Sequence, residues 1–258
     1  MALNGPIVRV AAVGDLHCGK DSQGALQPLF ARIAEAADVL ALCGDLTDYG
    51  LPDEAKILVR ELAGTVKVPV VGVFGNHDYE SGRADEVKTI LVDAGVRILD
   101  GDCFEVGGVG FAGVKGFAGG FGDRALQSWG EPVLKAFVRE AVEEALKLEA
   151  ALARIQATRR VAILHYSPVR GTVDPEPPEV IPFLGSSRLE EPINRYGAVV
   201  AVHGHAHHGM PEGQTSAGIP VYNVALPLLR AVNGGRPPFR LIEVPVPQEA
   251  ATPAAASV

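Results

Sequence analysis

Residues 7–17 read IVRVAAVGDLH, an apolar and largely β-branched run that ends at a glycine and leads into Asp15 and His17. The run predicts a buried β-strand over Ile7–Val13, because such residues pack well on a pleated surface covered on both faces. A carboxylate and an imidazole therefore stand directly beyond the carboxyl end of the first strand.

The same pattern, an apolar run followed by polar residues, occurs four more times along the chain. The strands that it predicts are Val39–Cys43, Val70–Phe74, Val161–Leu164 and Ala198–Val202. They lead, in that order, into GDLTD at 44–48, GNHD at 75–78, His165 and HGHAH at 203–207. Ligands bind at the carboxyl ends of strands in open α/β sheets, so we expect five strand ends to deliver their polar groups to one rim.

Helical patterns separate the first strands and indicate an α/β fold with parallel strands and right-handed crossovers. These helices are expected at Leu26–Ala37, Pro52–Leu62 and Ala84–Ala94. Short strands at Cys103–Val106 and Val109–Ala112, joined by Gly107-Gly108, then predict a hairpin and hence a mixed sheet or a second sheet. A long helix at Glu131–Ala157 carries one apolar stripe, which favours packing on a sheet face over a coiled-coil partner.

The rest of the chain predicts shorter elements and two irregular segments. Gly113–Gly122 is expected to be a flexible lid or a strand crossing near the rim, and Pro168–Pro182 an irregular part of the rim. A helix is expected at Ser187–Tyr196, with strands at Pro220–Val224 and Phe239–Val244. We expect one domain over residues 1–244 and a disordered tail over residues 245–258, which lack a core-forming pattern.

The composition excludes several classes of protein. The 258 residues carry 23 Lys and Arg against 31 Asp and Glu, a net charge of −8, and no basic tract. That balance argues against an extended nucleic-acid surface. No apolar run approaches the roughly 20 residues that span a bilayer, and the amino terminus lacks a signal-peptide pattern. Three cysteines do not make a disulfide framework, so we expect a cytoplasmic protein without a membrane partner. The oligomeric state stays open.

The polar groups at the strand ends are typical metal ligands. Imidazole and carboxylate without thiolate suit Mn, Fe, Zn or Ni better than a structural zinc site. Seven candidates are too many for one tetrahedral ion, but they suit two divalent metal ions that share a carboxylate. The candidate ligands are Asp15, His17, Asp45, Asn76, His165, His205 and His207.

Taken in order, these motifs resemble the signature of the calcineurin-like metallophosphoesterase superfamily: Asp-x-His, Gly-Asp-x-x-Asp, Gly-Asn-His-Asp, a separate His, and Gly-His-x-His. The resemblance spans Asp15 to His207 and implies a four-layer αββα sandwich with two central mixed β-sheets. It assigns one ion to Asp15, His17, Asp45 and His207, and the other to Asp45, Asn76, His165 and His205, with Asp45 as the bridge. Many relatives have a Gly directly after the first His, whereas Cys18 intervenes here. The motifs are more similar to the bacterial phosphodiesterase branch than to the phosphoprotein phosphatases.

The mechanism expected for such a centre is attack on phosphorus by a metal-bridging hydroxide, with Mn²⁺ foremost and Fe, Zn or Ni as alternatives. His77, beside a candidate ligand, is the expected proton donor to the leaving group. Asp78 would orient His77, with a turn or capping role as the alternative. Asp48 is read as a helix cap and His203 as a packed residue. His208, Cys18 and Cys43 receive no role, and Lys115 is at most a weak phosphate contact.

The sequence thus predicts a dinuclear metal-dependent phosphoesterase that hydrolyses small phosphate esters, phosphodiesters foremost. A nuclease, a phosphoprotein phosphatase and a non-catalytic interaction scaffold are the alternatives. The acidic charge disfavours the nuclease. The scaffold would be marked by missing metal ligands, and none is missing here.

Overall fold

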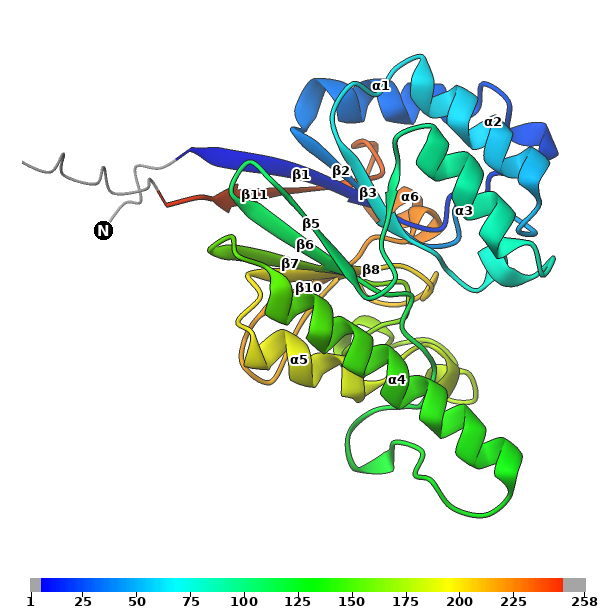
Figure 1. Cartoon of the computed structure of the whole chain (residues 1–258), viewed down its shortest axis with the longest axis vertical. Helices are drawn as coiled ribbons and strands as arrows, with labels where there is room; N and C mark the ends of the chain where they lie inside the picture. Colours follow the sequence, from blue (N-terminus) through cyan, green and yellow to red (C-terminus); the bar gives the residue numbers. More distant parts are fainter. Residues whose placement is uncertain (1–5, 248–258) are drawn as a thin grey trace, which may run out of the picture.

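Two β-sheets lie face to face at the centre of the protein, with helices on the outer face of each (Figure 1). The computed structural model describes residues 6–247. The four layers are helices, sheet, sheet and helices, which confirms the expected αββα sandwich.

The first sheet has the strand order β11-β1-β2-β3-β4. Strands β1 to β4 are parallel, and β11 pairs antiparallel with β1 at one edge. Their bounds are β1 Ile7–Val13, β2 Val39–Cys43, β3 Val70–Val73, β4 Arg97–Ile98 and β11 Arg240–Pro245. The helices α1 (Gln27–Ala36), α2 (Pro52–Ala63) and α3 (Ala84–Asp93) connect these strands and cover the outer face (Figure 1).

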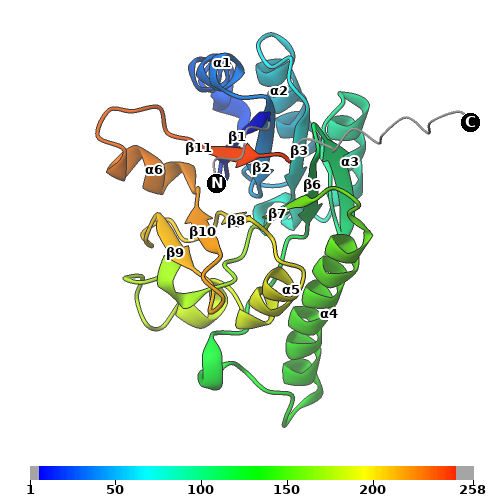
Figure 2. The ribbon, with the colours of Figure 1, turned by 90° about the vertical axis from the view of Figure 1, so that its left-hand side faces the viewer.

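The second sheet has the order β5-β6-β7-β8-β10-β9, with the outermost pair at each edge antiparallel and the inner strands parallel. The bounds are β5 Asp102–Val106, β6 Val109–Gly113, β7 Arg159–Ile163, β8 Val200–His203, β9 Glu212–Gln214 and β10 Pro220–Asn223. Helices α4 (Pro132–Arg154) and α5 (Glu190–Arg195) cover its outer face. Helix α6 (Leu226–Val232) lies on the opposite side of the molecule from α4 (Figure 2).

The period-2 pattern of the strands builds the core between the sheets. On β1, Val10 faces the second sheet, whereas Ala11 and Val13 face the helices. Residues from both sheets meet in the central layer, among them Val73 and Phe111. A strand buried on both faces needs apolar residues at successive positions, which explains the near-continuous apolar run of β1.

The elements match the sequence pattern closely, with a few differences. The Gly107-Gly108 hairpin is present, and both glycines have positive φ. The long helix packs on β5 and β6, as expected for a sheet-covering helix, and ends at Arg154. A 3₁₀ turn at Ser187–Leu189 replaces the first part of the helix expected at 187–196. Strand β9 and helix α6 were not predicted.

The domain boundary stays a prediction. Strand β11 includes Pro245, one residue past the expected boundary, and residues 248–258 lie outside the described part of the chain.

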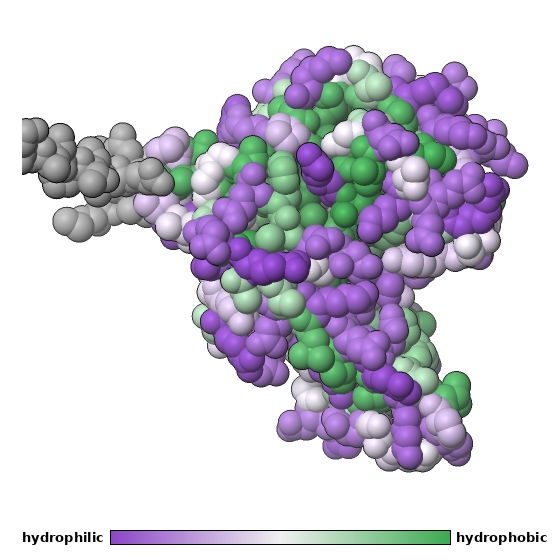
Figure 3. All heavy atoms as spheres, viewed as in Figure 1, coloured by the Kyte–Doolittle hydropathy of each residue, from purple (hydrophilic) through white to green (hydrophobic). Residues whose placement is uncertain are grey.

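Within residues 6–247, no helix has the length and apolarity needed to cross a membrane. Hydrophilic side chains cover much of the outer surface of α2 and α3 (Figure 3).

Candidate metal centre

The carboxyl ends of the strands in both sheets lie at one rim, and backbone hydrogen bonds join the loops that follow them. The Gly14 N–H donates to the Val224 carbonyl at 2.9 Å, which joins the end of β1 to the end of β10. The Asp15 N–H donates to the Gly44 carbonyl at 2.9 Å, so the loops after β1 and β2 run side by side. The polar groups that follow five strands thus converge, as the sequence predicts.

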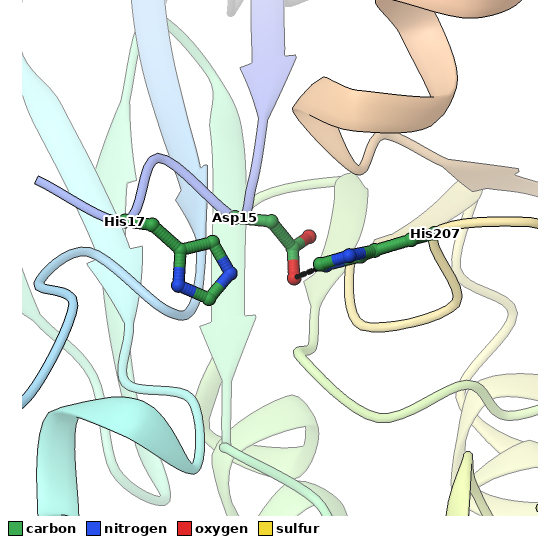
Figure 4. A group of neighbouring side chains, drawn as sticks. All are labelled: Asp15, His17 and His207. Carbon is green, nitrogen blue, oxygen red and sulfur yellow. Dashed lines mark hydrogen bonds and ion pairs between the residues drawn. The ribbon is translucent and has the colours of Figure 1, made fainter.

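Asp15 lies at the centre of the first group of side chains (Figure 4). Its carboxylate is buried, and one oxygen is 3.0 Å from Nε2 of His207. The backbone N–H of His205 donates to both Asp15 oxygens at 3.0 Å. His17 completes the group, with all ligand atoms within 4.8 Å of one another.

Asp45 lies between this group and a second one. Its Oδ2 is 3.8 Å from Nε2 of His17, and its Oδ1 is 3.4 Å from Nε2 of His165. His205 joins Asp45 and His165 in the second group. The two oxygens of one buried carboxylate therefore face two separate sets of imidazoles.

His165 connects the second group to the loop after β3. Its Nδ1 is 3.1 Å from the Cys43 carbonyl, which can only accept a hydrogen bond, so the proton lies on Nδ1. Its Nε2 is 3.0 Å from Oδ1 of Asn76 and 3.4 Å from Oδ1 of Asp45. A nitrogen and two oxygens thus lie close enough together to be ligands of one metal ion.

His17 gives a second test of whether the residues fit a metal. Its Nε2 is buried and has no hydrogen-bond partner within residues 6–247. An unpaired buried polar atom is costly unless something satisfies it. The donor set contains nitrogen and oxygen without sulfur, which suits a divalent transition metal. The residues fit the two ions that the sequence predicts.

The backbone at the candidate ligands is strained. Four non-glycine residues within the described chain have positive φ, and all four are candidate ligands: Asp15 at 55°, His17 at 43°, Asp45 at 47° and His205 at 70°. A non-glycine residue in this region costs about 1–3 kcal/mol and persists where its surroundings hold it. The surrounding structure therefore holds the backbone in these conformations, and this directs the four side chains toward one another.

Close packing explains two of the motif glycines. A Cβ at Gly75 would clash with the Asp45 carboxylate, and a Cβ at Gly204 would clash with the Asp15 carboxylate. The glycines of Gly-Asn-His-Asp and Gly-His-x-His therefore let the backbone of one loop lie directly on a carboxylate of another.

The pKa values follow from burial and from the carboxylates. Burial and the neighbouring His165 lower the pKa of His205 to about 3, which keeps it neutral and able to bind metal. Burial also lowers the pKa of His17. The hydrogen bond with Asp15 raises the pKa of His207. Burial acts to raise the pKa of Asp15, but the His207 bond and the nearby histidines outweigh it and lower that pKa.

His77 lies beside the first group, with its ring centroid 4.6 Å from that of His17. Its Nδ1 is 2.7 Å from the Asp48 carbonyl, so this nitrogen carries a proton and donates. Burial lowers the pKa of His77, but the Asp48 carbonyl and the charge of Asp45 outweigh burial and raise it. His77 also falls in a possible ligand group with His17 and Asp45, so its position suits either a proton donor or a ligand.

The orienting contact expected from Asp78 is wrong, because the Asp48 carbonyl occupies that position on His77. The Asp78 carboxylate is fully buried and accepts hydrogen bonds between 2.6 and 3.1 Å from two loops. The donors are the backbone N–H groups of Leu46, Thr47 and Gly75 and the hydroxyl of Thr47. Asp78 ties the loop after β2 to the loop after β3, and burial raises its pKa to about 6. Thr47, inside the Gly-Asp-x-x-Asp motif, is its partner and was not singled out.

The structure also shows the surroundings of Asp48, His203, His208 and the two cysteines beside the motifs. Asp48 is not a helix cap, because Leu51 is the N-cap of α2; the Asp48 Oδ1 lies 3.4 Å from Nδ1 of His17. His203 is buried and packed, with Nε2 2.7 Å from the Thr172 hydroxyl and Nδ1 2.7 Å from the Gly204 carbonyl. His208 is exposed, and Cys18 and Cys43 are buried free thiols.

The glycine-rich segment crosses the rim and is bonded to the opposite loop. Gly119 N–H donates to the Pro182 carbonyl at 2.8 Å, and Gly120 N–H donates to the Gly185 carbonyl at 2.9 Å. These bonds favour the strand-crossing interpretation over a flexible lid. Lys115 lies over the rings of Phe117 and Tyr166, at 4.8 and 5.4 Å from their centroids.

The two sheets bring carboxylates and imidazoles from several strand ends to one rim, a set of ligands that suits divalent transition metals. The chain belongs to the calcineurin-like phosphoesterase family, whose model matches residues 8–209. It is therefore a metal-dependent hydrolase of phosphoric esters. None of the curated proteins matches the sequence.

Solved structures share the fold at low sequence identity. The phosphopantetheinyl hydrolase PptH from Mycobacterium tuberculosis superposes with a TM-score of 0.66 at 18% identity, covering 97% of this chain and 100% of that one. The protein TT1561 of Thermus thermophilus gives 0.53 at 15% identity, covering 93% and 99%. GAP50, the anchor in the inner membrane complex of Plasmodium, gives 0.54 at 11% identity, covering 86% and 72%. These likenesses concern the fold.

Proposed function

We propose that this protein hydrolyses small phosphate esters, phosphodiesters foremost, at two divalent metal ions. The observation that carries the proposal is the position of Asp45, whose two oxygens face His17 on one side and His165 on the other. One ion would be held by Asp15, His17, Asp45 and His207. The other would be held by Asp45, Asn76, His165 and His205.

Two divalent ions, when bound, activate a water as nucleophile and neutralise the charge on the phosphate oxygens. The residues of the chain supply the rest. Asp45 would hold the two sites at a fixed separation, and its own position is fixed by the backbone N–H of His77, which donates to Oδ1 at 2.9 Å. The strained loops aim the ligands before any substrate arrives, which favours electrostatic preorganisation.

His77 supplies the proton that the leaving oxygen needs. Its raised pKa increases the protonated fraction near neutral pH. Because Nδ1 donates to the Asp48 carbonyl, the proton on Nε2 is the one free for transfer. Asp48 thus orients His77 through its backbone, in place of the carboxylate of Asp78.

The net charge of −8 supports a small substrate over a nucleic acid. A phosphopantetheinyl group linked through its phosphate is a diester, so the fold shared with a hydrolase of that name is compatible with a diester substrate. GAP50 is described as an anchor, but the candidate ligands of this chain are complete and adjacent, which supports catalysis here over a scaffold.

Mn²⁺ is our first choice of ion, and three free thiols support a reducing cytoplasm.

The test is to strip the protein of metal and to reload it with Mn, Fe, Zn or Ni. Each form is assayed on bis-(p-nitrophenyl) phosphate, p-nitrophenyl phosphate and a panel of cyclic nucleotides. We expect no turnover without metal and the highest kcat/KM on a diester with Mn²⁺. Turnover that survives metal removal would contradict the proposal, and a preference for the monoester would overturn the diester assignment.

A further inference from the structure

A cavity of about 380 Å³ opens beside the candidate metal centre, on the side of His17. It lies between the 3₁₀ turn Lys20–Ser22, after β1, and the segment Asp48–Leu51, after β2. Its volume falls within the usual range for small-molecule sites. His17 is both a lining residue and a candidate ligand, so the cavity adjoins the candidate metal centre at this side chain.

The lining has an aromatic surface and an excess of negative charge. Tyr49 lines the cavity and is 54% exposed. Asp21, Asp48 and Glu54 bring three carboxylates, whereas Lys20 brings one ammonium group. Glu54 is buried and accepts the N–H groups of Tyr49 and Leu51 at 2.9 and 3.2 Å.

These contacts separate structural groups from available ones. Glu54 holds the Tyr49 backbone in place, so the ring is presented on a fixed segment. Asp48 directs Oδ1 to His17 and is 36% exposed, so it also contributes charge to the opening. Tyr49, Lys20 and Asp21 are exposed and free to contact a ligand.

From this we propose that the cavity binds one organic arm of the substrate, and that it selects an uncharged group with an aromatic ring over one with a second anionic group. The proposal rests on the phosphoesterase function above and names the substrate class of that same site. The Tyr49 ring provides a stacking face, because any flat heterocycle offers a matching π-surface. The carboxylates of Asp21 and Asp48 accept hydrogen bonds from hydroxyl or amino groups and repel a second phosphate.

Three substrates with one leaving group separate these effects. They are methyl p-nitrophenyl phosphate, thymidine 5′-(p-nitrophenyl phosphate), and the latter compound with an added 3′-phosphate. We expect the thymidine diester to have the highest kcat/KM. We expect the 3′-phosphate to lower kcat/KM about tenfold, and Asp21→Asn to restore part of that loss without affecting the methyl ester.

Tyr49→Ala should lower kcat/KM for the thymidine diester by about tenfold or more, chiefly through KM, because a base–aromatic stack is lost. The methyl ester should change less than about twofold. Tyr49→Phe, which keeps the ring, should behave as the unmodified protein. Trp129→Ala is the matched control, an aromatic residue that is 62% exposed and outside the cavity.

Equal losses for the methyl and thymidine esters in Tyr49→Ala, or equal rates with and without the 3′-phosphate, would overturn the proposal. Binding provides a readout that needs no turnover. Saturation-transfer NMR with thymidine should show contact with the unmodified protein and lose it in Tyr49→Ala, whereas an unchanged signal would overturn the subsite. Failure of the metal-loaded protein to hydrolyse any of the esters would instead count against the proposed function.

Discussion

The candidate ligands stand directly after strands, which is why the spacing of the motifs predicts where the candidate site lies. Asp15 and Asp45 follow the adjacent parallel strands β1 and β2, so the strand pattern predicts that they are neighbours. His165 follows β7 of the second sheet and joins them because the two sheets pack face to face. The sequence does not show why the motif glycines are needed, whereas in the structure Gly75 and Gly204 are required by contact with carboxylates. The partner of Asp78 could not be predicted, because a buried carboxylate chooses among all nearby donors and the sequence does not show which are nearby.

His77 provides the prediction closest to the chemistry. His77→Ala and His77→Asn should keep both metal ions and lower kcat by about 10²- to 10⁴-fold on a poor leaving group, because the proton donor is lost. The loss should shrink with p-nitrophenolate, which needs little protonation. The measurement is kcat across leaving groups together with the metal content. Loss of an ion would show that His77 is a ligand, and an equal loss of kcat for all leaving groups would contradict its role as proton donor.

Asp78 provides a prediction about stability. Asp78→Asn should lower the free energy of unfolding by about 2–4 kcal/mol, because the amide nitrogen replaces one carboxylate oxygen. It cannot accept the two hydrogen bonds made there, which come from Leu46 and Gly75 at Oδ2 or from Thr47 at Oδ1. Urea unfolding measures this value. Asp21→Asn, at an exposed position, is the control and should change the free energy by less than about 0.5 kcal/mol. A neutral Asp78→Asn would mean that the carboxylate does not hold the two loops together.

Long periodic helices and the apolar strands were predicted well, whereas the short strand β9 and the short helix α6 were not. Helix α4 has enough turns for its apolar stripe to be recognised. Val138, Ala141 and Leu148 of that stripe are buried, and the helix packs on β5 and β6. Helix α6 has seven residues and starts at Leu226 with a proline beside it, too short for a period. Tertiary contacts determine whether so short a helix forms, and one of them is the hydrogen bond from the Leu226 N–H to the Gly14 carbonyl.

Helix α4 allows a matched pair of substitutions. Leu152 is fully buried in the cluster under the second sheet, whereas Leu146 is 57% exposed. Leu152→Ala should cost about 2–5 kcal/mol of unfolding free energy through the cavity it leaves, and Leu146→Ala less than about 0.5 kcal/mol. Denaturant unfolding of both variants measures the difference. Similar costs at the two positions would place the buried face of α4 elsewhere.

The whole molecule is acidic, and its basic residues are scattered. Arg159 begins β7, at the end opposite His165, so it adds no positive field at the rim. We expect kcat/KM for a small diester to exceed that for a duplex oligonucleotide at both about 50 and about 200 mM salt. Steady-state kinetics on both substrates give the comparison. Faster cleavage of the duplex, with a steep fall as salt rises, would reveal a basic surface and favour a nuclease.

We propose that one carboxylate, Asp45, joins two metal ions where the strand ends of the two sheets meet. Mass spectrometry of the intact, metal-loaded protein counts the ions that are bound. We expect two ions in the unmodified chain, one in His207→Ala, and weakened binding of both in Asp45→Asn, because each ion loses a ligand there. Two tightly bound ions in Asp45→Asn, with unchanged activity, would contradict the account.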